Sequence, residues 1–124
     1  MKKAMLILAH GSKVEATKDT AFKIRDEIKL REIYTDVKVA FLQFNKPDIK
    51  EVALELYDHG ITHIVVAPMF LFEGNHILYD IPKEFEEIKQ LCPGLTISMA
   101  KPLGYDERIA EIIIERAEGE LCAI

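Results

Sequence analysis

The sequence predicts an α/β fold in which a four-stranded parallel sheet carries helices on both faces. Three observations lead to this prediction. First, the segments at 4–9, 37–42, 64–70 and 95–99 are continuously apolar, which is typical of strands buried on both faces. Second, apolar residues recur at helical spacing after each segment. Third, strands that alternate with helices form parallel sheets through right-handed crossovers, and the flavodoxin-like arrangement predicts the strand order 2-1-3-4.

Each predicted helix has an apolar stripe, and turn residues mark where most of the helices begin or end. Pro47 suits the first turn of the second helix, and Gly60 suits its left-handed end. Pro93 and Gly94 close the third helix, and Asp106 can cap the fourth. In chain order, the stripes are Ala21, Ile24 and Ile28; Ile49, Val52, Ala53 and Leu56; Phe85, Ile88 and Leu91; and Ile109, Ile112, Ile113 and Ala117.

Length and composition predict one domain spanning residues 1–124 and exclude several classes of protein. With 49% apolar and 30% charged residues, the 124-residue chain can bury a core and is not of the disordered type. Its net charge of −5 disfavours nucleic acid as a partner. Cys92 and Cys122 form no metal-binding pair, and the apolar segments are too short for a signal peptide or a membrane helix. We therefore expect a cytoplasmic protein that binds neither nucleic acid nor membrane.

Two histidines follow the strands between which the predicted strand order reverses. Open parallel sheets bind ligands at this point, beyond the carboxyl ends of the strands. His10 comes directly after the first strand, and His76 lies in the loop after the third, so both imidazoles are expected at one crevice. Imidazole binds Co²⁺, Ni²⁺, Fe²⁺ and Zn²⁺ and accepts protons near neutral pH. An open site with two such ligands suits the delivery or activation of a metal ion.

Other polar residues have structural interpretations. His59 precedes a helix end, where positive charge is favourable, and His63 lies at the opposite edge of the sheet. Asp80 can cap the third helix. Ser12 can cap the first, whose backbone N–H groups would be available to an anionic ligand. The phosphate-loop, dinucleotide and nucleophile-elbow motifs do not occur, and Ala9 stands where a histidine phosphatase needs arginine.

Four segments carry a family resemblance. They read ILAHGS at 7–12, AFL at 40–42 leading to Pro47, PMFLFEGNH at 68–76 running into DIP at 80–82, and PLGYDERI at 102–109. In this order, and over nearly the whole chain, they resemble the small, single-domain CbiX-type sirohydrochlorin chelatases. The third segment taken together with DIP is specific to this family, whereas HGS alone is common.

The resemblance implies a lyase, a sirohydrochlorin cobaltochelatase that inserts Co²⁺, or alternatively Ni²⁺, in the biosynthesis of cobalamin, sirohaem or cofactor F430. It implies that His10 is a proton acceptor and metal ligand and that His76 is the second ligand. The metal ion is then a substrate, and no cofactor is permanently bound. The loop bordering the macrocycle would comprise Leu71, Phe72, Glu73, Gly74, Asn75 and His76, with Leu71 and Phe72 forming either an apolar platform or core, and Phe70 forming core.

The chain departs from the family pattern in the loop after the second strand. Gln43 and Lys46 stand where relatives often carry acids, and Lys13 where they often carry arginine. Lys46, with Ser12, becomes a candidate contact for substrate carboxylates. The missing acids keep open a non-catalytic carrier of metal or tetrapyrrole that uses the same two loops. A covalent phosphate chemistry at His10 is a third, weaker alternative.

Size predicts the assembly. A domain of this length has a radius of gyration of about 14 Å, which is small beside a polyanionic tetrapyrrole. Larger relatives consist of two such halves, so we expect a two-fold homodimer with facing clefts.

Overall fold

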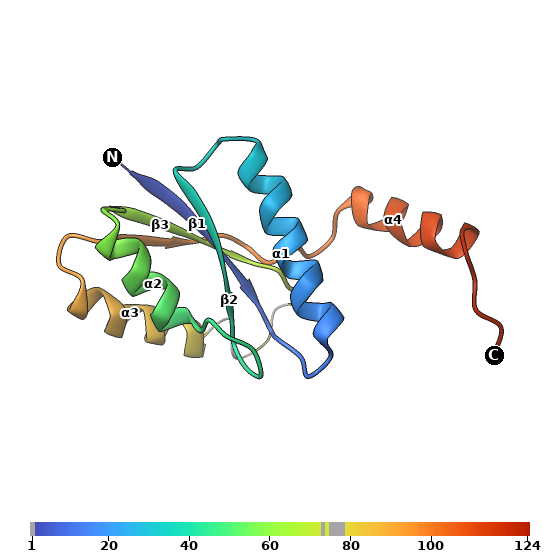
Figure 1. Ribbon diagram of the computed structural model, residues 1–124, viewed down its shortest axis with the longest axis horizontal. Coiled ribbons are helices and arrows are strands. Elements are labelled where there is room, and N and C mark those ends of the chain that lie inside the picture. Colours follow the sequence, from blue (N-terminus) through green and yellow to red (C-terminus); the bar gives the residue numbers. More distant parts are fainter. Residues whose placement is uncertain (1, 73, 75–78) are drawn as a thin grey trace.

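The computed structural model describes residues 2–72, 74 and 79–124. Strands and helices alternate along this part of the chain (Figure 1). Each strand lies within two residues of its predicted position, although β3 ends before Phe70. The elements are β1 (Lys3–Ala9), α1 (Glu15–Leu30), β2 (Asp36–Phe41), α2 (Ile49–Asp58), β3 (His63–Pro68), α3 (Ile81–Leu91), β4 (Thr96–Met99) and α4 (Glu107–Glu118).

The strands form one parallel sheet with the order β2-β1-β3-β4, which confirms the predicted topology. In the register, Met5 of β1 lies between Val37 of β2 and Val65 of β3, and Val65 pairs with Ser98 of β4. The strand order reverses between β1 and β3. The chain therefore leaves these two strands at neighbouring points of the same carboxyl edge.

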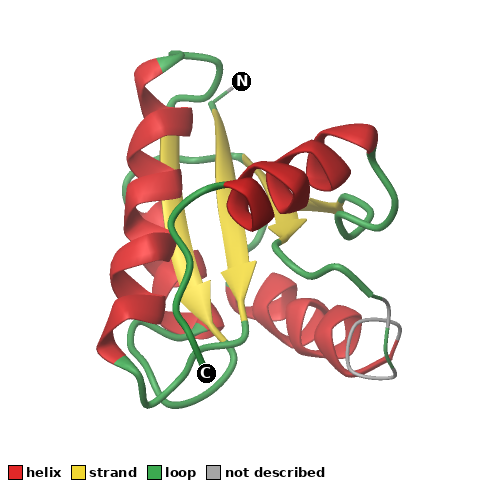
Figure 2. Ribbon diagram, turned by 90° about the vertical axis from the view of Figure 1, so that its right-hand side faces the viewer, coloured by secondary structure: helices red, strands yellow, loops and turns green. Residues whose placement is uncertain are grey.

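Helices cover both faces of the sheet, as predicted, but they cover them unequally. Helices α2 and α3 pack on one face, and α1 lies on the other (Figure 2). The larger core lies under α2 and α3 and includes Leu6, Leu8, Ile64 and Val66 of the sheet. The smaller core joins α1 to β1 and β2. It comprises Ile7, Ala9, Ala21, Val37, Val39 and Phe41, with Met5, Phe22, Ile28, Tyr34 and Met69 packed against it.

Helix α2 begins after Pro47, which the sequence analysis placed in its first turn. Asp48 is its N-cap: the Asp48 side chain accepts a hydrogen bond from the Glu51 N–H (2.9 Å), and the Glu51 side chain accepts one from the Asp48 N–H (3.2 Å). This capping box satisfies two backbone donors that a helix end leaves free. Pro47 therefore precedes the cap instead of occupying the first turn. Gly60 ends the helix at φ +89°, as predicted.

The predicted cap of α1 is wrong. The N-cap residue is Val14, which makes no side-chain capping bond, and the helix starts at Glu15. Ser12 lies two residues earlier, where its Oγ accepts a hydrogen bond from the Val14 N–H (3.0 Å). Ser12 thus stabilises the turn that leads into the helix.

Helix α4 forms where predicted, and Asp106 caps it by accepting from the Arg108 N–H (2.9 Å), but its apolar stripe is not buried. The helix extends away from the sheet (Figure 1), and none of its residues is buried. Ile112 and Ile113 are 49% and 62% exposed. Periodicity identifies a stripe that needs a partner without identifying the partner. No helix in the described part of the chain is long and apolar enough to cross a membrane.

Candidate functional site

The loops after β1 and β2 are locked together at the carboxyl edge. Gly11 has φ +91°, and a Cβ atom on it would lie 1.8 Å from the Gln43 carbonyl oxygen, so only glycine fits there. The Gln43 N–H donates to the His10 carbonyl oxygen (3.0 Å), and the Ser12 N–H donates to Asn45 Oδ1 (2.7 Å). These contacts fix the backbone on both sides of Gly11 and therefore the position of His10.

The His10 side chain lies at the point where the strand order reverses. Its imidazole stacks on the Phe70 ring, with centroids 4.2 Å apart and planes tilted by 39°. Phe70 follows β3 and is only 5% exposed, whereas His10 is exposed. A buried phenyl ring from one strand end thus supports an accessible imidazole from the other. Within the described residues, the ring nitrogens of His10 have no hydrogen-bond partner, which leaves them available to a ligand.

A cavity of about 260 Å³ opens beside this imidazole. The described residues that line it are His10, Leu42, Gln43, Asp80, Ile81 and Glu84. Asp80 occupies the predicted N-cap position of α3, but its side chain makes no capping hydrogen bond. The carboxylates of Asp80 and Glu84 make this cavity attractive to cations.

Glu84 is a site residue that the sequence analysis missed. Burial raises the pKa of its carboxyl above the ordinary value, and the nearby carboxylates of Asp48 and Glu87 add to the shift. A signal for it existed, because Glu84 follows Asp80 by four positions and so lies one helical turn further on the same face.

An exposed apolar surface continues from the cavity along the loops after β3 and β4. Leu71 is 44% and Phe72 82% exposed, so these two side chains are not core, whereas Phe70 is core as predicted. The Leu103 N–H donates to the Phe70 carbonyl oxygen (2.8 Å), and the Gly104 N–H donates to that of Leu71 (3.0 Å). The second loop therefore holds the first in place. Gly74, the next described residue of the predicted macrocycle loop, is also exposed.

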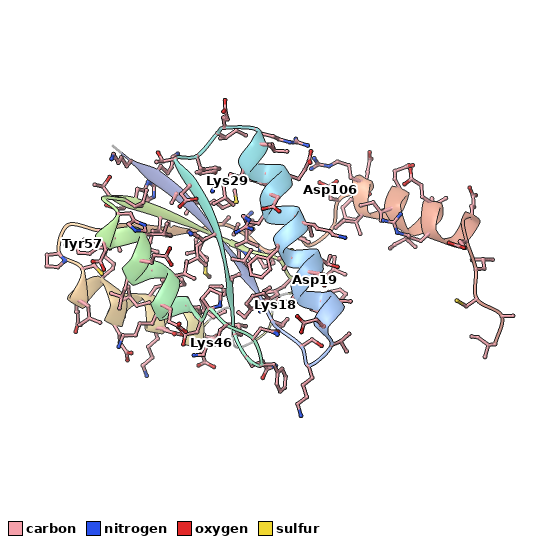
Figure 3. All side chains as sticks on the ribbon, in the orientation of Figure 1. Lys18, Asp19, Lys29, Lys46, Tyr57 and Asp106 are labelled. Atoms are coloured by element: carbon pink, nitrogen blue, oxygen red, sulfur yellow. The ribbon has the colours of Figure 1, made fainter. Side chains whose placement is uncertain are left out.

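Lys46 lies at the same edge, at the start of α2 (Figure 3), but it is already paired. Its Nζ is 3.0 Å from Asp48 Oδ2 and 3.0 Å from Glu51 Oε1, and these two hydrogen bonds raise the pKa of the lysine. The ammonium is exposed, so it can exchange these partners for a carboxylate of a ligand.

The other two histidines have the structural roles expected of them. His63 Nε2 lies 2.9 Å from Ser98 Oγ, at the opposite end of the strands from His10. His59 is the C-cap residue of α2. The predictions for Glu73, Asn75 and His76 concern positions outside the described residues. Among residues that are described, no three His, Cys, Asp or Glu side chains are arranged to hold a metal ion.

The sheet topology and the histidine-lined carboxyl edge are those of a chelatase-like α/β domain. The family model named CbiX matches residues 4–120. The chain therefore belongs to the CbiX family, and the predicted family resemblance is confirmed.

Two relatives of similar length are both named sirohydrochlorin cobaltochelatase. A sirohydrochlorin cobaltochelatase of Sulfurisphaera tokodaii is 41% identical over 114 residues, covering 92% of this chain and 90% of that protein. One of Methanococcus maripaludis is 28% identical over 141 residues, covering 94% and 98%. The sirohydrochlorin chelatase SirB of Bacillus subtilis subspecies spizizenii, solved in complex with cobalt, superposes with a TM-score of 0.88 at 30% identity. That match covers 95% of this chain but only 50% of SirB, so this chain spans half the length of SirB.

Proposed function

We propose that this chain is a sirohydrochlorin cobaltochelatase, a lyase that inserts Co²⁺ into the tetrapyrrole on the way to cobalamin. The observation that carries the proposal is the position of His10 at the strand-order reversal, stacked on Phe70 in a chain of the CbiX family. The imidazole faces an open edge with carboxylates beside it, and metal insertion needs such an arrangement.

Insertion replaces two pyrrole N–H protons with one divalent ion, so the site must accept protons and hold the metal weakly. His10 can do both in turn: its neutral imidazole ligates the incoming ion, and once the ion has moved to the ring it accepts a pyrrole proton and passes it to water. We assign His76 as the second ligand. With two protein ligands, coordination positions stay open for the ring nitrogens.

Carboxylates within the cavity compensate for the amide at position 43. Where relatives often carry an acid, this chain has Gln43, whose neutral amide adds no negative charge for a cation and does not accept a proton near neutral pH. Glu84 lines the same cavity, and its raised pKa makes it a better proton acceptor than an ordinary surface glutamate. We assign to Glu84 the role of drawing Co²⁺ toward His10 and sharing in proton removal.

The macrocycle lies across the open edge instead of inside the cavity. Enclosed sites for ligands of even moderate size have volumes of about 300–1,000 Å³, and the cavity beside His10 is smaller. The exposed side chains of Leu71, Phe72 and Leu103 offer an apolar platform for a flat ring. Glu73, Gly74, Asn75 and His76 continue that border in the sequence. We assign Lys46 and the start of α1 near Ser12 as contacts for the ring's carboxylates.

We assign Co²⁺ as a substrate and not as a resident cofactor. Imidazole also accepts Ni²⁺ and Fe²⁺, so the supply of metal in the cell contributes to the choice among them. We further propose that residues 1–124 form one domain, that two copies form a homodimer, and that the protein acts in the cytoplasm. Cys92 and Cys122 are unpaired, which suits a reducing compartment.

Multiple turnover distinguishes a chelatase from the alternative function, a non-catalytic carrier of metal or tetrapyrrole. Gln43 and Lys46 in place of acids favour a carrier that binds metal or tetrapyrrole without converting it. The protein is mixed with an excess of sirohydrochlorin and Co²⁺, and the absorption change of the macrocycle is followed against the reaction without protein. A chelatase converts many equivalents per chain. An absorption change that stops at one equivalent per chain, as stoichiometric binding would give, would establish the carrier and overturn the proposed activity.

A further inference from the structure

The loop after β2 holds Phe44 in a backbone conformation that bulky residues rarely adopt. Its φ is +68°, and the Asn45 N–H donates to the Gln43 carbonyl oxygen (2.8 Å), which closes a tight turn around Phe44. Such a turn with a positive φ is rare and strained. Among the described residues other than glycine, only Glu32 also has a positive φ, and it follows the end of α1, where a left-handed residue is common. A helix end does not account for Phe44.

Burial does not account for this conformation either. The Phe44 side chain is 61% exposed, so the turn places an apolar ring largely in water. The left-handed backbone and the exposed ring both oppose the stability of the fold. Backbone outliers persist where the surrounding structure imposes them, and they gather at functional sites. The position of Phe44 relative to the candidate site therefore indicates what its ring can do.

The turn around Phe44 is bound to the loop that carries His10. The Gln43 N–H donates to the His10 carbonyl oxygen (3.0 Å), and the Ser12 N–H donates to Asn45 Oδ1 (2.7 Å). The residues on both sides of Phe44 are thus bound to the loop after β1, and the two loops lie side by side at the carboxyl edge (Figures 1 and 2). Gln43 also lines the His10 cavity. Phe44 therefore has a fixed place next to a residue of the candidate site.

Lys13, from the loop after β1, lies over the Phe44 ring. Its Nζ is 5.5 Å from the ring centroid, which is within the range of a cation–π interaction. Lys13 is exposed, and it forms no ion pair with any residue that the structure describes. Lys46 differs, because Asp48 and Glu51 already neutralise its charge. The phenyl ring thus holds an ammonium group whose charge remains available to an anion.

The strand order places this pair across the carboxyl edge from the apolar platform. Strand β1 lies between β2 and β3, so His10 lies between the loop that carries Phe44 and the loop that carries Phe72. Neighbouring strands are about 4.8 Å apart, so these two loops begin roughly 10 Å from each other. Phe72 is 82% exposed. A flat macrocycle that reaches both loops has its centre at His10 and an exposed phenyl ring at each side.

We propose that Phe44 and Lys13 form a clamp for the substrate: the phenyl ring packs on the rim of the macrocycle on the side of β2, and the ammonium binds one of its carboxylates. The clamp rests on the proposed function, because it takes the substrate to be a tetrapyrrole. A phenyl ring and a cation on adjacent loops match the two features of that substrate, a flat conjugated ring and carboxylate side chains.

The experiment measures two properties of full-length variants. The dissociation constant for sirohydrochlorin comes from an absorption titration without metal, and kcat and KM come from cobalt insertion. Phe44→Asn removes the ring and supplies a residue that tolerates the left-handed backbone. Its dissociation constant and KM should rise at least about fivefold, with kcat within about twofold, because the clamp binds the ring and moves no proton. Phe44→Tyr keeps an aromatic ring and should restore wild-type binding.

Lys13→Gln tests the charged half of the clamp. The dissociation constant should rise about threefold, and this rise should shrink at high salt, because salt screens the attraction between exposed charges. Lys3→Gln is the matched control, since Lys3 Nζ lies 5.7 Å from the centroid of the Tyr34 ring, at the opposite edge of the sheet from His10. It should bind sirohydrochlorin as tightly as the wild type does.

The results distinguish the clamp from the chelatase activity. Wild-type affinity in Phe44→Asn, with cobalt insertion by the wild type, would overturn the clamp alone. A loss of kcat at unchanged KM would also overturn it, because Phe44 would then only position His10. A wild type that binds sirohydrochlorin without turnover, with weaker binding in Phe44→Asn and Lys13→Gln, would refute the chelatase and support the clamp. A wild type that binds no sirohydrochlorin would overturn both. If Phe44→Asn does not fold, Phe44→Gly removes the same ring.

Discussion

Gly11→Ala tests whether the contact between the loops after β1 and β2 positions His10. The added Cβ would lie 1.8 Å from the Gln43 carbonyl oxygen, and Cβ atoms essentially never approach another atom closer than 3.0 Å, so the loops must separate by about 1.2 Å. That movement breaks the two hydrogen bonds that join them, at about 1 kcal/mol each. The left-handed backbone adds about 1–2 kcal/mol for a residue with a side chain. We expect the free energy of unfolding to fall by about 3–4 kcal/mol.

Activity should fall as well, because His10 moves with its loop. A displacement of about 1 Å in a reacting group can slow a reaction about 10²-fold. Gly94→Ala is the matched control: Gly94 has φ +85°, nothing lies within 4 Å of its added Cβ, and it is far from the site. Gly94→Ala should lower the free energy of unfolding only by the cost of the left-handed backbone, about 1–2 kcal/mol, and should insert cobalt at the wild-type rate. The measurements are urea unfolding and initial rates of cobalt insertion. Equal losses of stability in the two variants, with full activity in Gly11→Ala, would refute the positioning role.

Three further predictions use other contacts. Asp48→Ala removes the cap of α2 and lowers stability by about 1 kcal/mol at pH 7 in thermal unfolding. Hydrogen bonding lowers the pKa of Asp48, so this difference should shrink as the pH falls below about 4, whereas Asp48→Asn should stay capped. Phe70→Ala should lower the free energy of unfolding by about 3–5 kcal/mol, because Phe70 is buried. Phe72→Ala should change the free energy of unfolding by no more than about 0.5 kcal/mol and raise KM for sirohydrochlorin. Equal losses of stability in the two variants would contradict these predictions. Burial raises the pKa of Glu84, so the stability of the wild type relative to Glu84→Gln should fall as the pH rises above about 4.5. Glu84→Gln should also insert cobalt more slowly than the wild type. Parallel curves of stability against pH for the two proteins would count against the role assigned to Glu84.

The fold was predictable because its signals are local and agree with one another. Continuous apolarity locates the strands, and the alternation with helices then leaves few topologies. The edge at which His10 lies follows from that topology alone. The stripe of α4 was equally clear, but periodicity does not say which molecule buries it. Sequence alone therefore described the element correctly and its packing wrongly.

The details of the site were less predictable. Ser12 is a favourable cap residue, but the helix begins beyond it, and Val14 takes the cap position without a side-chain bond. Glu84 looks like one more charge on an amphipathic helix, because only the placement of α3 against the carboxyl edge brings it to the His10 cavity. Lys46 stays a predicted substrate contact, and the sequence analysis did not foresee that its ammonium pairs with Asp48 and Glu51 at the start of α2. Local backbone geometry decided the first case and local side-chain pairing the third, and only the position of Glu84 depends on a tertiary contact.

The role of His10 is tested most directly by the initial rate of cobalt insertion under multiple turnover. His10→Ala should lose at least about 10²-fold in rate while keeping the wild-type circular dichroism and unfolding midpoint, since the imidazole is exposed. His63→Ala, which removes a histidine from the opposite edge, should insert cobalt at the wild-type rate. A His10→Ala protein that turns over as fast as wild type would contradict the assignment of this edge as the site of metal insertion.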